Sequence, residues 1–182
     1  MVEKYSELLK LARETIESEL GGKELKISEK IKKKYSEKKA CFVTLTMADS
    51  GELRGCIGSL YPSRELWKDA AENARNAAFS DPRFNSLDKD ELNKIKIEIS
   101  ILSVPEKIEY KTEDELKRKI SGKGVIIKKG WNSATYLPQV WTDLPEFEEF
   151  ISSLCSKAGL SYNAWKDLDL EVFVYEAKKF EE

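Results

Sequence analysis

The 182-residue chain contains no histidine and only three cysteines, and each shortage excludes a kind of chemistry. Without imidazole, a Ser-His-Asp triad, a Cys-His dyad and any zinc site with histidine ligands are all impossible. The cysteines, at positions 41, 56 and 155, show no C-x-x-C spacing, so neither a disulfide framework nor a structural zinc is expected. The sequence therefore predicts no metal site and identifies no cofactor.

Long apolar runs are also missing, since no segment approaches the roughly 20 residues that a membrane-spanning helix needs. The stretch 1–11 is amphipathic and has no apolar h-region or small-residue cleavage site, so secretion is not expected. The net charge of −2 argues against a general nucleic-acid-binding protein. We expect a cytoplasmic protein, and the dominance of Lys and Glu among its charged residues favours a heat-adapted source.

Apolar periodicity predicts an α+β fold. Helical spacing and capping signals predict helices at 3–20, 28–38, 63–79, 112–120 and 145–158. Alternating apolar residues predict strands at 41–47, 52–60, 95–102, 125–129, 134–139 and 170–175. Most connections are hairpins or short helical excursions, which favours antiparallel sheets over a doubly wound parallel fold.

We expect two unequal domains, each with an antiparallel sheet flanked by helices. Residues 40–103 are predicted to form the smaller domain, with one sheet and its covering helices. Residues 1–39 are predicted to join 104–182 in a larger, discontinuous domain. This division follows from the order of the predicted elements along the chain.

The most informative segment is Arg-Gly-Cys-Ile-Gly-Ser at 54–59, which lies on a predicted strand. Side chains alternate between the two faces of a strand, so Arg54, Cys56 and Gly58 share one face. A guanidinium beside a thiol lowers the thiol pKa, and the thiolate is the reactive form. Glycines within a strand, such as Gly55 and Gly58, are typical of close approach by a ligand or another backbone.

The same residues also have a purely structural interpretation. Arg54 can pair with a carboxylate, Cys56 can pack as a small hydrophobic side chain, and the glycines can mark a bulge. Glu98 alternates onto the polar face of its predicted strand, where it is a candidate acid or base. Alternatively, Glu98 forms a cross-strand salt bridge with Arg54.

Two further segments contain candidate binding residues. In Asp-Pro-Arg-Phe at 81–84, Asp81 can cap a turn, whereas Arg83 is harder to explain by packing. In Leu-Pro-Gln-Val-Trp at 137–141, a strand proline indicates an edge or a bulge. Gln139 and the following tryptophan can bind a planar ligand, or the tryptophan can close the core.

Together, the segments at 53–60, 81–84 and 137–141 closely resemble the AMMECR family, named for the Alport-syndrome, midface-hypoplasia and elliptocytosis chromosomal region. The resemblance extends from about residue 8 to residue 180 and indicates an archaeal or other thermophile member. It implies an α+β protein of two unequal domains, the larger built from both chain ends, with an active site in the cleft between them. It also implies association with Memo-like and radical-SAM proteins, without an established activity.

Two functions from different classes follow. The first is a cytoplasmic enzyme that acts on an unknown small molecule or macromolecule in this cleft. Cys56 would be the nucleophile or redox thiol, Arg54 would lower its pKa or hold an anionic group, and Glu98 would be the acid or base. The binding residues would be Gly55, Gly58, Asp81, Arg83 and Gln139.

The second function is that of a non-catalytic module that binds a partner protein, such as a Memo-like or radical-SAM protein. Nucleic-acid binding by the lysines between 30 and 39 is the least favoured function.

Overall fold

The computed structural model describes residues 5–182, so the start of the predicted 3–20 helix and of the 1–11 stretch lies outside the described part. The helices are α1 (Ser6–Leu20), α2 (Glu29–Lys34), α3 (Leu66–Phe79), α4 (Glu113–Ile120), α5 (Val140–Asp143) and α6 (Phe147–Lys157). The strands are β1 (Cys41–Met47), β2 (Leu53–Gly58), β3 (Ile95–Leu102), β4 (Glu106–Ile108), β5 (Gly124–Lys129), β6 (Asn132–Tyr136), β7 (Glu171–Tyr175) and β8 (Ala177–Glu181). They form two four-stranded antiparallel sheets, ordered β2-β1-β3-β8 and β4-β7-β5-β6, which confirms the predicted α+β class.

The contacts divide the chain into two compact units, and their boundaries differ from the predicted ones. The first unit comprises the chain up to residue 104 together with 178–182, and the second comprises 105–177. The N-terminal segment joins the first unit because α1 packs on α3 and β3. The C-terminal residues join it because β8 pairs with β3 as an edge strand, an element that the sequence does not predict.

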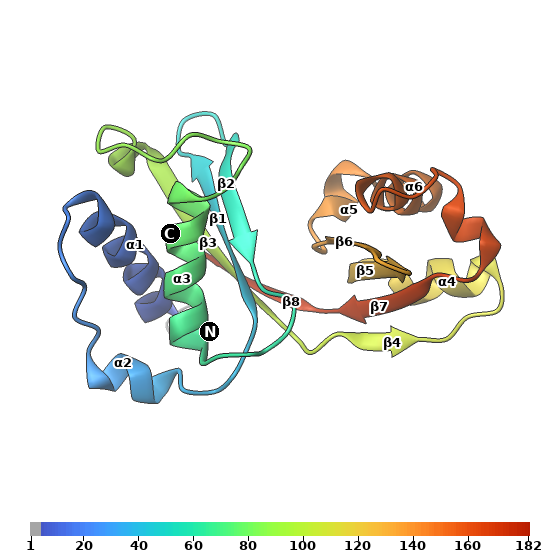
Figure 1. The fold of residues 1–182 in the computed structure, drawn as a ribbon, viewed down its shortest axis with the longest axis horizontal. Helices are drawn as coiled ribbons and strands as arrows, with labels where there is room; N and C mark the ends of the chain where they lie inside the picture. The colour runs from blue at the N-terminus through green and yellow to red at the C-terminus, as the bar shows by residue number, and fades with distance from the viewer. Residues whose placement is uncertain (1–4) are drawn as a thin grey trace. The chain divides into compact units, whose positions relative to one another are not determined.

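In the first unit, α1 and α3 lie side by side and cover one face of the β2-β1-β3-β8 sheet (Figure 1). The core between them contains alternating apolar residues of β1 and β3, such as Val43, Leu45, Ile97 and Ile99. The alanine-rich side of α3 allows a very close approach to β2. A Cβ atom on Gly55 would overlap the backbone carbonyl oxygen of Ala77.

The register of β1 fixes the neighbours of the Cys56 side chain. Thr44 lies opposite Cys56 on β2 and opposite Glu98 on β3. A two- or four-residue turn would place an apolar residue of β1 opposite Cys56, and a three-residue turn would reverse this relation. The structure has the reversed relation, because Arg54 lies opposite no residue of β1 and this bulge shifts the register by one residue. The thiol of Cys56 therefore lies on the polar face of β1, and it does not share a face with Cys41.

In the second unit, α4 and α6 pack on one face of the β4-β7-β5-β6 sheet. Leu116 of α4 and Phe150 of α6 meet Ile127 of β5 in this core. Thr112 caps the start of α4, because its hydroxyl accepts the N–H of Glu115 at 3.2 Å. The Glu115 carboxylate in turn accepts the N–H of Lys111 at 2.9 Å. Two short elements, β4 and α5, are absent from the sequence-based prediction.

The predicted strand at 134–139 is too long, because β6 ends at Tyr136. The Trp141 N–H donates to the carbonyl of Pro138 at 3.2 Å, so the proline begins a helical turn and does not lie in a strand. The indole of Trp141 stacks on Phe150, with ring centroids 3.8 Å apart. Of the two alternatives for this tryptophan, the structure has the one that closes the core.

Among the residues that the structure describes, no helix combines the length and the apolar character needed to cross a lipid bilayer.

Candidate functional site

The peptide groups of Cys56 lie at the free edge of β2. Because the N–H of Ser59 donates to the carbonyl of Cys41, the alternation of an antiparallel ladder turns the Cys56 N–H and C=O away from β1. Asp81 Oδ2 accepts the Cys56 N–H at 2.9 Å, and Arg83 Nη2 lies 3.3 Å from the Cys56 carbonyl as its donor. This pair, which we term the Asp81 clamp, occupies the edge at a point where another strand would otherwise pair.

The Asp81 clamp is a bidentate ion pair with one buried and one accessible partner. Arg83 donates from Nε to Oδ1 at 2.9 Å and from Nη2 to Oδ2 at 2.7 Å. The Asp81 side chain is 1% exposed, whereas the Arg83 side chain is 53% exposed. The guanidinium holds the pKa of the Asp81 carboxyl well below its usual range, so this carboxylate stays charged at neutral pH.

The Cys56 thiol is a neutral group in this environment. Its Sγ lies 3.3 Å from the hydroxyl of Thr44. Burial raises the pKa of the thiol, and the hydrogen bond to Thr44 and the charge of Arg83 only partly oppose this effect. The negative charges of Asp81 and Glu98 raise the pKa further. The expected lowering of the Cys56 pKa is therefore wrong, and the arginine that favours the thiolate is Arg83.

Arg54 is engaged by another carboxylate. Its Nε and Nη2 donate to the two oxygens of Glu91 at 2.7 and 2.8 Å, and Nη2 also donates to the carbonyl of Asn85 at 3.0 Å. The guanidinium lowers the pKa of the Glu91 carboxyl. The structural interpretation of Arg54 as an ion-pair partner is confirmed, but the predicted partner Glu98 is wrong.

Glu98 belongs to a polar row that crosses the sheet. Cys56, Thr44 and Glu98 occupy one line across β2, β1 and β3. Lys179 of β8 completes the row, with its Nζ 2.7 Å from Glu98 Oε2. The hydroxyl of Ser100 donates to the other oxygen of Glu98 at 3.3 Å. The row thus places a thiol, a hydroxyl, a carboxylate and an ammonium group on the face opposite α1 and α3.

The two glycines of the motif accommodate other parts of the protein. Gly55 lies against the backbone of α3, and Gly58 lies under the ring of Phe42, its cross-strand partner. Close approach is therefore the reason for both glycines, as the strand pattern predicts, but the approaching groups belong to the chain itself. Within residues 5–182, no group of three or more acidic or cysteine side chains is arranged to hold a metal ion.

An open pocket of about 570 Å³ lies beside β2. Its lining includes Arg54, Arg83, Phe84, Asn85, Asp88 and Glu91. The ring centroid of Phe84 lies 5.8 Å from the guanidinium carbon of Arg54 and 5.5 Å from that of Arg83. The segments at 53–60 and 81–84, which are distant in the sequence, therefore meet at this pocket.

The remaining candidate, Gln139, belongs to the second unit. It is exposed directly before α5, and its carbonyl accepts the Thr142 N–H at 2.9 Å. The structure thus groups Cys56, Asp81 and Arg83 closely and places Glu98 on the strand beyond Thr44, in register with it. Arg54 shares the pocket with Arg83.

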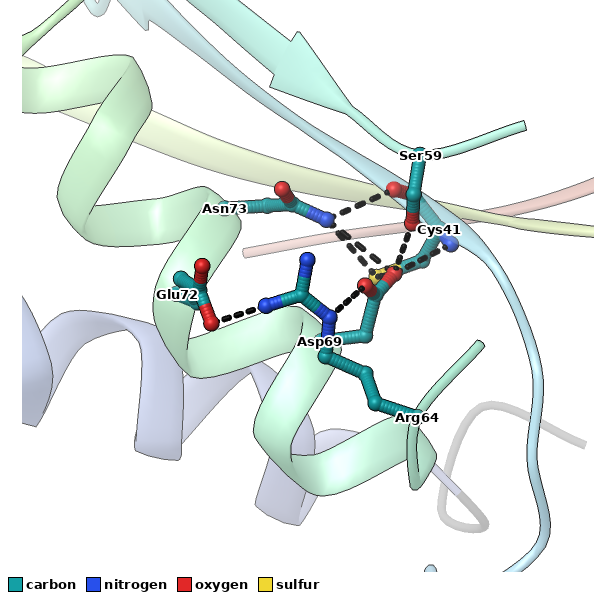
Figure 2. Close-up of polar contacts among 6 residues, drawn as sticks. All are labelled: Cys41, Ser59, Arg64, Asp69, Glu72 and Asn73. Carbon is teal, nitrogen blue, oxygen red and sulfur yellow. Dashed lines mark hydrogen bonds and ion pairs between the residues drawn. The ribbon is translucent and has the colours of Figure 1, made fainter. Parts of the chain in front are cut away.

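A second buried carboxylate, which the sequence analysis missed, holds the other ends of β1 and β2 (Figure 2). Asp69 Oδ2 accepts the Cys41 N–H at 2.9 Å, the Ser59 hydroxyl at 2.5 Å and the Asn73 amide at 3.1 Å. Arg64 Nε forms an ion pair with Oδ1 at 3.1 Å, in a geometry that falls short of a hydrogen bond. We term this arrangement the Asp69 clamp. Asp69 and Asn73 lie one helical turn apart on the alanine-rich face of α3, and this pattern could have indicated a buried polar cluster.

The Asp69 clamp also acts on the thiol of Cys41. The thiol donates to Asp69 Oδ2 at 3.4 Å. Burial and the nearby carboxylate charge together raise the pKa of Cys41 well above its usual value. Cys41 is therefore a buried, protonated thiol without nucleophilic character.

Comparison with known proteins places these features in a wider group. The AMMECR1 family model matches residues 9–180. A protein of Nanoarchaeum equitans is 41% identical over 182 residues, covering 96% of this chain and 98% of that protein. A protein of Aquifex aeolicus is 37% identical over 182 residues, covering 97% and 91%. The crystal structure of an uncharacterised protein from Pyrococcus horikoshii matches with a TM-score of 0.90 and 36% identity, covering 99% of this chain and 92% of that chain.

The chain is thus an α+β protein with two four-stranded antiparallel sheets, a fold that it shares with the Pyrococcus horikoshii protein. Its relatives occur in archaea and bacteria, many of them thermophiles. The chain belongs to the AMMECR1 family, which confirms the resemblance predicted from its three sequence segments.

Proposed function

We propose that the chain is an enzyme whose active site is the face of β2 that carries Cys56, and that its substrate is a small molecule or a macromolecule. The observation that carries this proposal is the Asp81 clamp, which fixes both peptide groups of Cys56 with a buried ion pair. The thiol itself is left beside the hydroxyl of Thr44. Such rigid support of one partly accessible residue is typical of a preorganised functional site.

The proposed chemistry begins from a neutral thiol. The S–H bond of Cys56 breaks as its proton passes to the Thr44 hydroxyl, which in turn gives its own proton to the carboxylate of Glu98. The sulfur then forms a bond to an electrophilic carbonyl carbon of the substrate as the C=O π bond breaks, and the electron pair that moves to the oxygen takes up the proton held by Glu98. The register supports this order, because Thr44 lies between the other two residues in the polar row. Lys179 is the counter-ion of Glu98 before the transfer.

Alkylation of the folded protein tests the proposal, with the chain's other cysteines as internal controls. Cys41 and Cys155 are buried, whereas Cys56 is partly exposed. We expect iodoacetamide to label Cys56 first, at a rate that rises with pH up to and beyond 9.0 because burial raises the thiol pKa above this ordinary value. Peptide mass spectrometry measures the three rates.

A protection experiment then asks whether a substrate occupies the site. Preincubation with a cellular metabolite extract should slow the labelling of Cys56 and leave the labelling of Cys41 in unfolded protein unchanged. Labelling of all three cysteines at one rate, only on unfolding, would contradict the enzyme proposal. Equal labelling of Cys56 with and without extract would count against a small-molecule substrate.

A second candidate function, partner binding, is favoured by an exposed apolar group in the second unit. Trp131 is fully exposed at the tip of the β5–β6 hairpin. The Asn132 side chain donates to the carbonyl of Gly159 at 3.1 Å, which holds this tip against the loop that leads to exposed Tyr162. Aromatic side chains of this kind are enriched among the energetically dominant residues of interfaces.

Calorimetric titration with a purified Memo-like protein tests this candidate. Trp131→Ala should weaken binding by about tenfold or more, whereas Tyr61→Ala, at an exposed aromatic residue of the first unit, should not. Cys56→Ser should leave binding intact. Loss of binding in the Cys56 variant alone would contradict a partner site at the hairpin tip.

A further inference from the structure

The pocket beside β2 is built by a long irregular segment between α3 and the 3₁₀ turn at Leu92–Lys94. This segment folds over Arg54, which holds it through the carbonyl of Asn85 and the carboxylate of Glu91. Long loops that are fixed by specific contacts are frequently binding loops. The pocket volume of about 570 Å³ lies within the range of small-molecule sites.

One end of the pocket is cationic. Arg83 uses Nε and Nη2 to bind Asp81, and none of the residues described in the structure accepts a hydrogen bond from its Nη1. The side chain is 53% exposed, and its guanidinium lies over the ring of Phe84. Because Asp81 is buried behind it, Arg83 presents the accessible half of the ion pair to the pocket.

Another part of the lining is anionic. Asp88 Oδ1 accepts the N–H groups of Asp90 and Glu91 at 2.9 and 3.0 Å, which leaves Oδ2 for other donors. Among residues 5–182, Asp88 forms no ion pair with Arg83, whose Nε and Nη2 bind the two oxygens of Asp81. Asp88 and Arg83 therefore act as separate charges within the same lining.

The remaining charges of the pocket cancel locally. Arg54 is matched by the bidentate carboxylate of Glu91. An ion of one sign would thus be attracted by Arg83 and repelled by Asp88, or the reverse. A ligand that carries one positive and one negative charge is attracted by both Arg83 and Asp88. The pocket would therefore select ligands by the arrangement of their charges and not by their net charge.

We infer that this pocket binds a small zwitterion of the amino-acid or short-peptide class, with its carboxylate at Arg83 and its ammonium group at Asp88. The aliphatic and aromatic surface of Phe84 lies beside the carboxylate end. This inference concerns the pocket and does not depend on a reactive thiol at Cys56.

Titration of the unmodified protein with glycylglycine, acetate and ethylammonium, at matched ionic strength, tests the inference. We expect saturable chemical-shift changes in the NMR signals of residues 82–91 with glycylglycine. Acetate and ethylammonium, which each carry half of the charge pattern, should bind at least tenfold more weakly. Acetate binding as tightly as glycylglycine would overturn the inference in favour of a simple anion site, and absence of saturable binding by all three would overturn it outright.

A matched pair of substitutions locates the ammonium end. Asp88→Asn keeps an oxygen that can accept the Asp90 and Glu91 N–H groups but removes the charge. Asp49→Asn is the control, because Asp49 is an exposed aspartate that accepts the N–H of Ser50 at 2.7 Å in the same manner outside the pocket. We expect at least a tenfold loss of glycylglycine affinity in the first variant and none in the second. Equal affinity in both would overturn the assignment of Asp88.

Cys56→Ser separates this inference from the enzyme proposal. Glycylglycine affinity should be unchanged in this variant, since the thiol is not part of the pocket lining. Glycylglycine binding together with an unreactive Cys56 in the wild type would support the zwitterion site and contradict the enzyme proposal. A reactive Cys56 without glycylglycine binding would support the enzyme proposal and contradict the zwitterion site.

Discussion

A buried aspartate binds the backbone of a cysteine at each end of α3, but the two cysteine thiols differ in their environment. Asp69 lies in the first turn of α3, and Asp81 lies just beyond its last turn. Each carboxylate is buried, and each accepts a cysteine N–H at 2.9 Å, from Cys41 and Cys56 respectively. The difference is in the thiol. Cys41 donates its S–H to the clamping carboxylate, whereas Cys56 turns its sulfur to a hydroxyl on the neighbouring strand.

This difference shows how one motif separates a structural cysteine from a candidate functional one. At the Asp69 clamp, four donors, one of them the Cys41 thiol, converge on one carboxylate oxygen inside the sheet–helix interface, so the group fixes the sheet and keeps Cys41 protonated. At the Asp81 clamp, the carboxylate satisfies a strand edge, and its arginine remains half exposed. The first clamp therefore acts on stability, and the second acts on the presentation of Cys56.

The largest effect is expected from Asp69→Ala. This change leaves the Cys41 N–H, the Ser59 hydroxyl and the Asn73 amide without their shared acceptor, and each buried donor left unpaired costs about 1–3 kcal/mol. We expect a loss of about 4 kcal/mol in the free energy of unfolding of the first unit. Hydrogen exchange of the β1 amides measures this unit by itself.

Asp81→Ala is the matched control, because it removes the acceptor of the strand-edge N–H of Cys56 and of the backbone N–H of half-exposed Arg83, which can turn toward water. We expect a loss of about 2 kcal/mol or less for this variant. Equal losses in the two variants would break the distinction between a stability clamp and a presentation clamp.

An intermediate effect is expected between the two clamps, where α3 approaches β2. In Gly55→Ala, the new methyl group meets the backbone carbonyl of Ala77, and neither α3 nor β2 can move without disturbing a clamp. We expect a loss of about 2–3 kcal/mol. Gly58→Ala meets the ring of Phe42, a side chain that can turn, and should cost about 1 kcal/mol. Urea denaturation compares the two variants, and a larger loss in Gly58→Ala would contradict this account.

Many of the helices and strands could be predicted, because the spacing of apolar residues and the capping residues are visible in short stretches of the sequence. Alternating isoleucines define β3, and the hydroxyl of Ser28 caps α2 as its position indicates. β8 was missed because its sequence, Ala-Lys-Lys-Phe-Glu, has little apolar alternation and is defined by pairing with β3. Without β8, the sequence pattern offered no reason to join residues 178–182 to the sheet of β1 and β3, so these residues were predicted to lie in the larger domain with 104–177.

Several residues of the candidate site could be predicted from the sequence, but the ion pairs and hydrogen bonds that they form could not. Cys56, Asp81 and Arg83 do lie together, because the loop after α3 returns to the edge of β2. The partner of Arg54 was not predictable, since Glu91 comes from an irregular loop. The side of the sheet on which the thiol lies depends on one bulge in β2, where Arg54 lies opposite no residue of β1. The glycines of this strand indicated that a bulge could occur, but they did not indicate its effect on the register.

A smaller, pH-dependent effect should distinguish Asp81→Asn from the wild type. The folded-state pKa of Asp81 is depressed, so its contribution to stability is present above the ordinary value of 3.8 and is lost as the pH falls below it. At pH 7 the variant should be less stable by about 1 kcal/mol, because the charged hydrogen bonds of the carboxylate with Arg83 and with the Cys56 N–H are replaced by weaker neutral ones. The gap should narrow as the pH is lowered from 5 to about 2.5. A gap of constant size in denaturation midpoints over this range would contradict the assigned pKa direction.

The smallest effect concerns the charge environment that distinguishes the two thiols. Glu98 raises the pKa of Cys56, so Glu98→Gln should lower this pKa and increase the iodoacetamide labelling rate at pH 8 by roughly twofold, since a partly solvated charge is screened. Glu181→Gln is the matched control, because Glu181 pairs with the same Lys179 but lies at the end of β8. Cys41 should stay unlabelled in both variants, as its thiol is held by Asp69. A slower rate for Cys56 in Glu98→Gln would contradict this electrostatic effect on the resting thiol and would instead support the role of Glu98 as the proton acceptor.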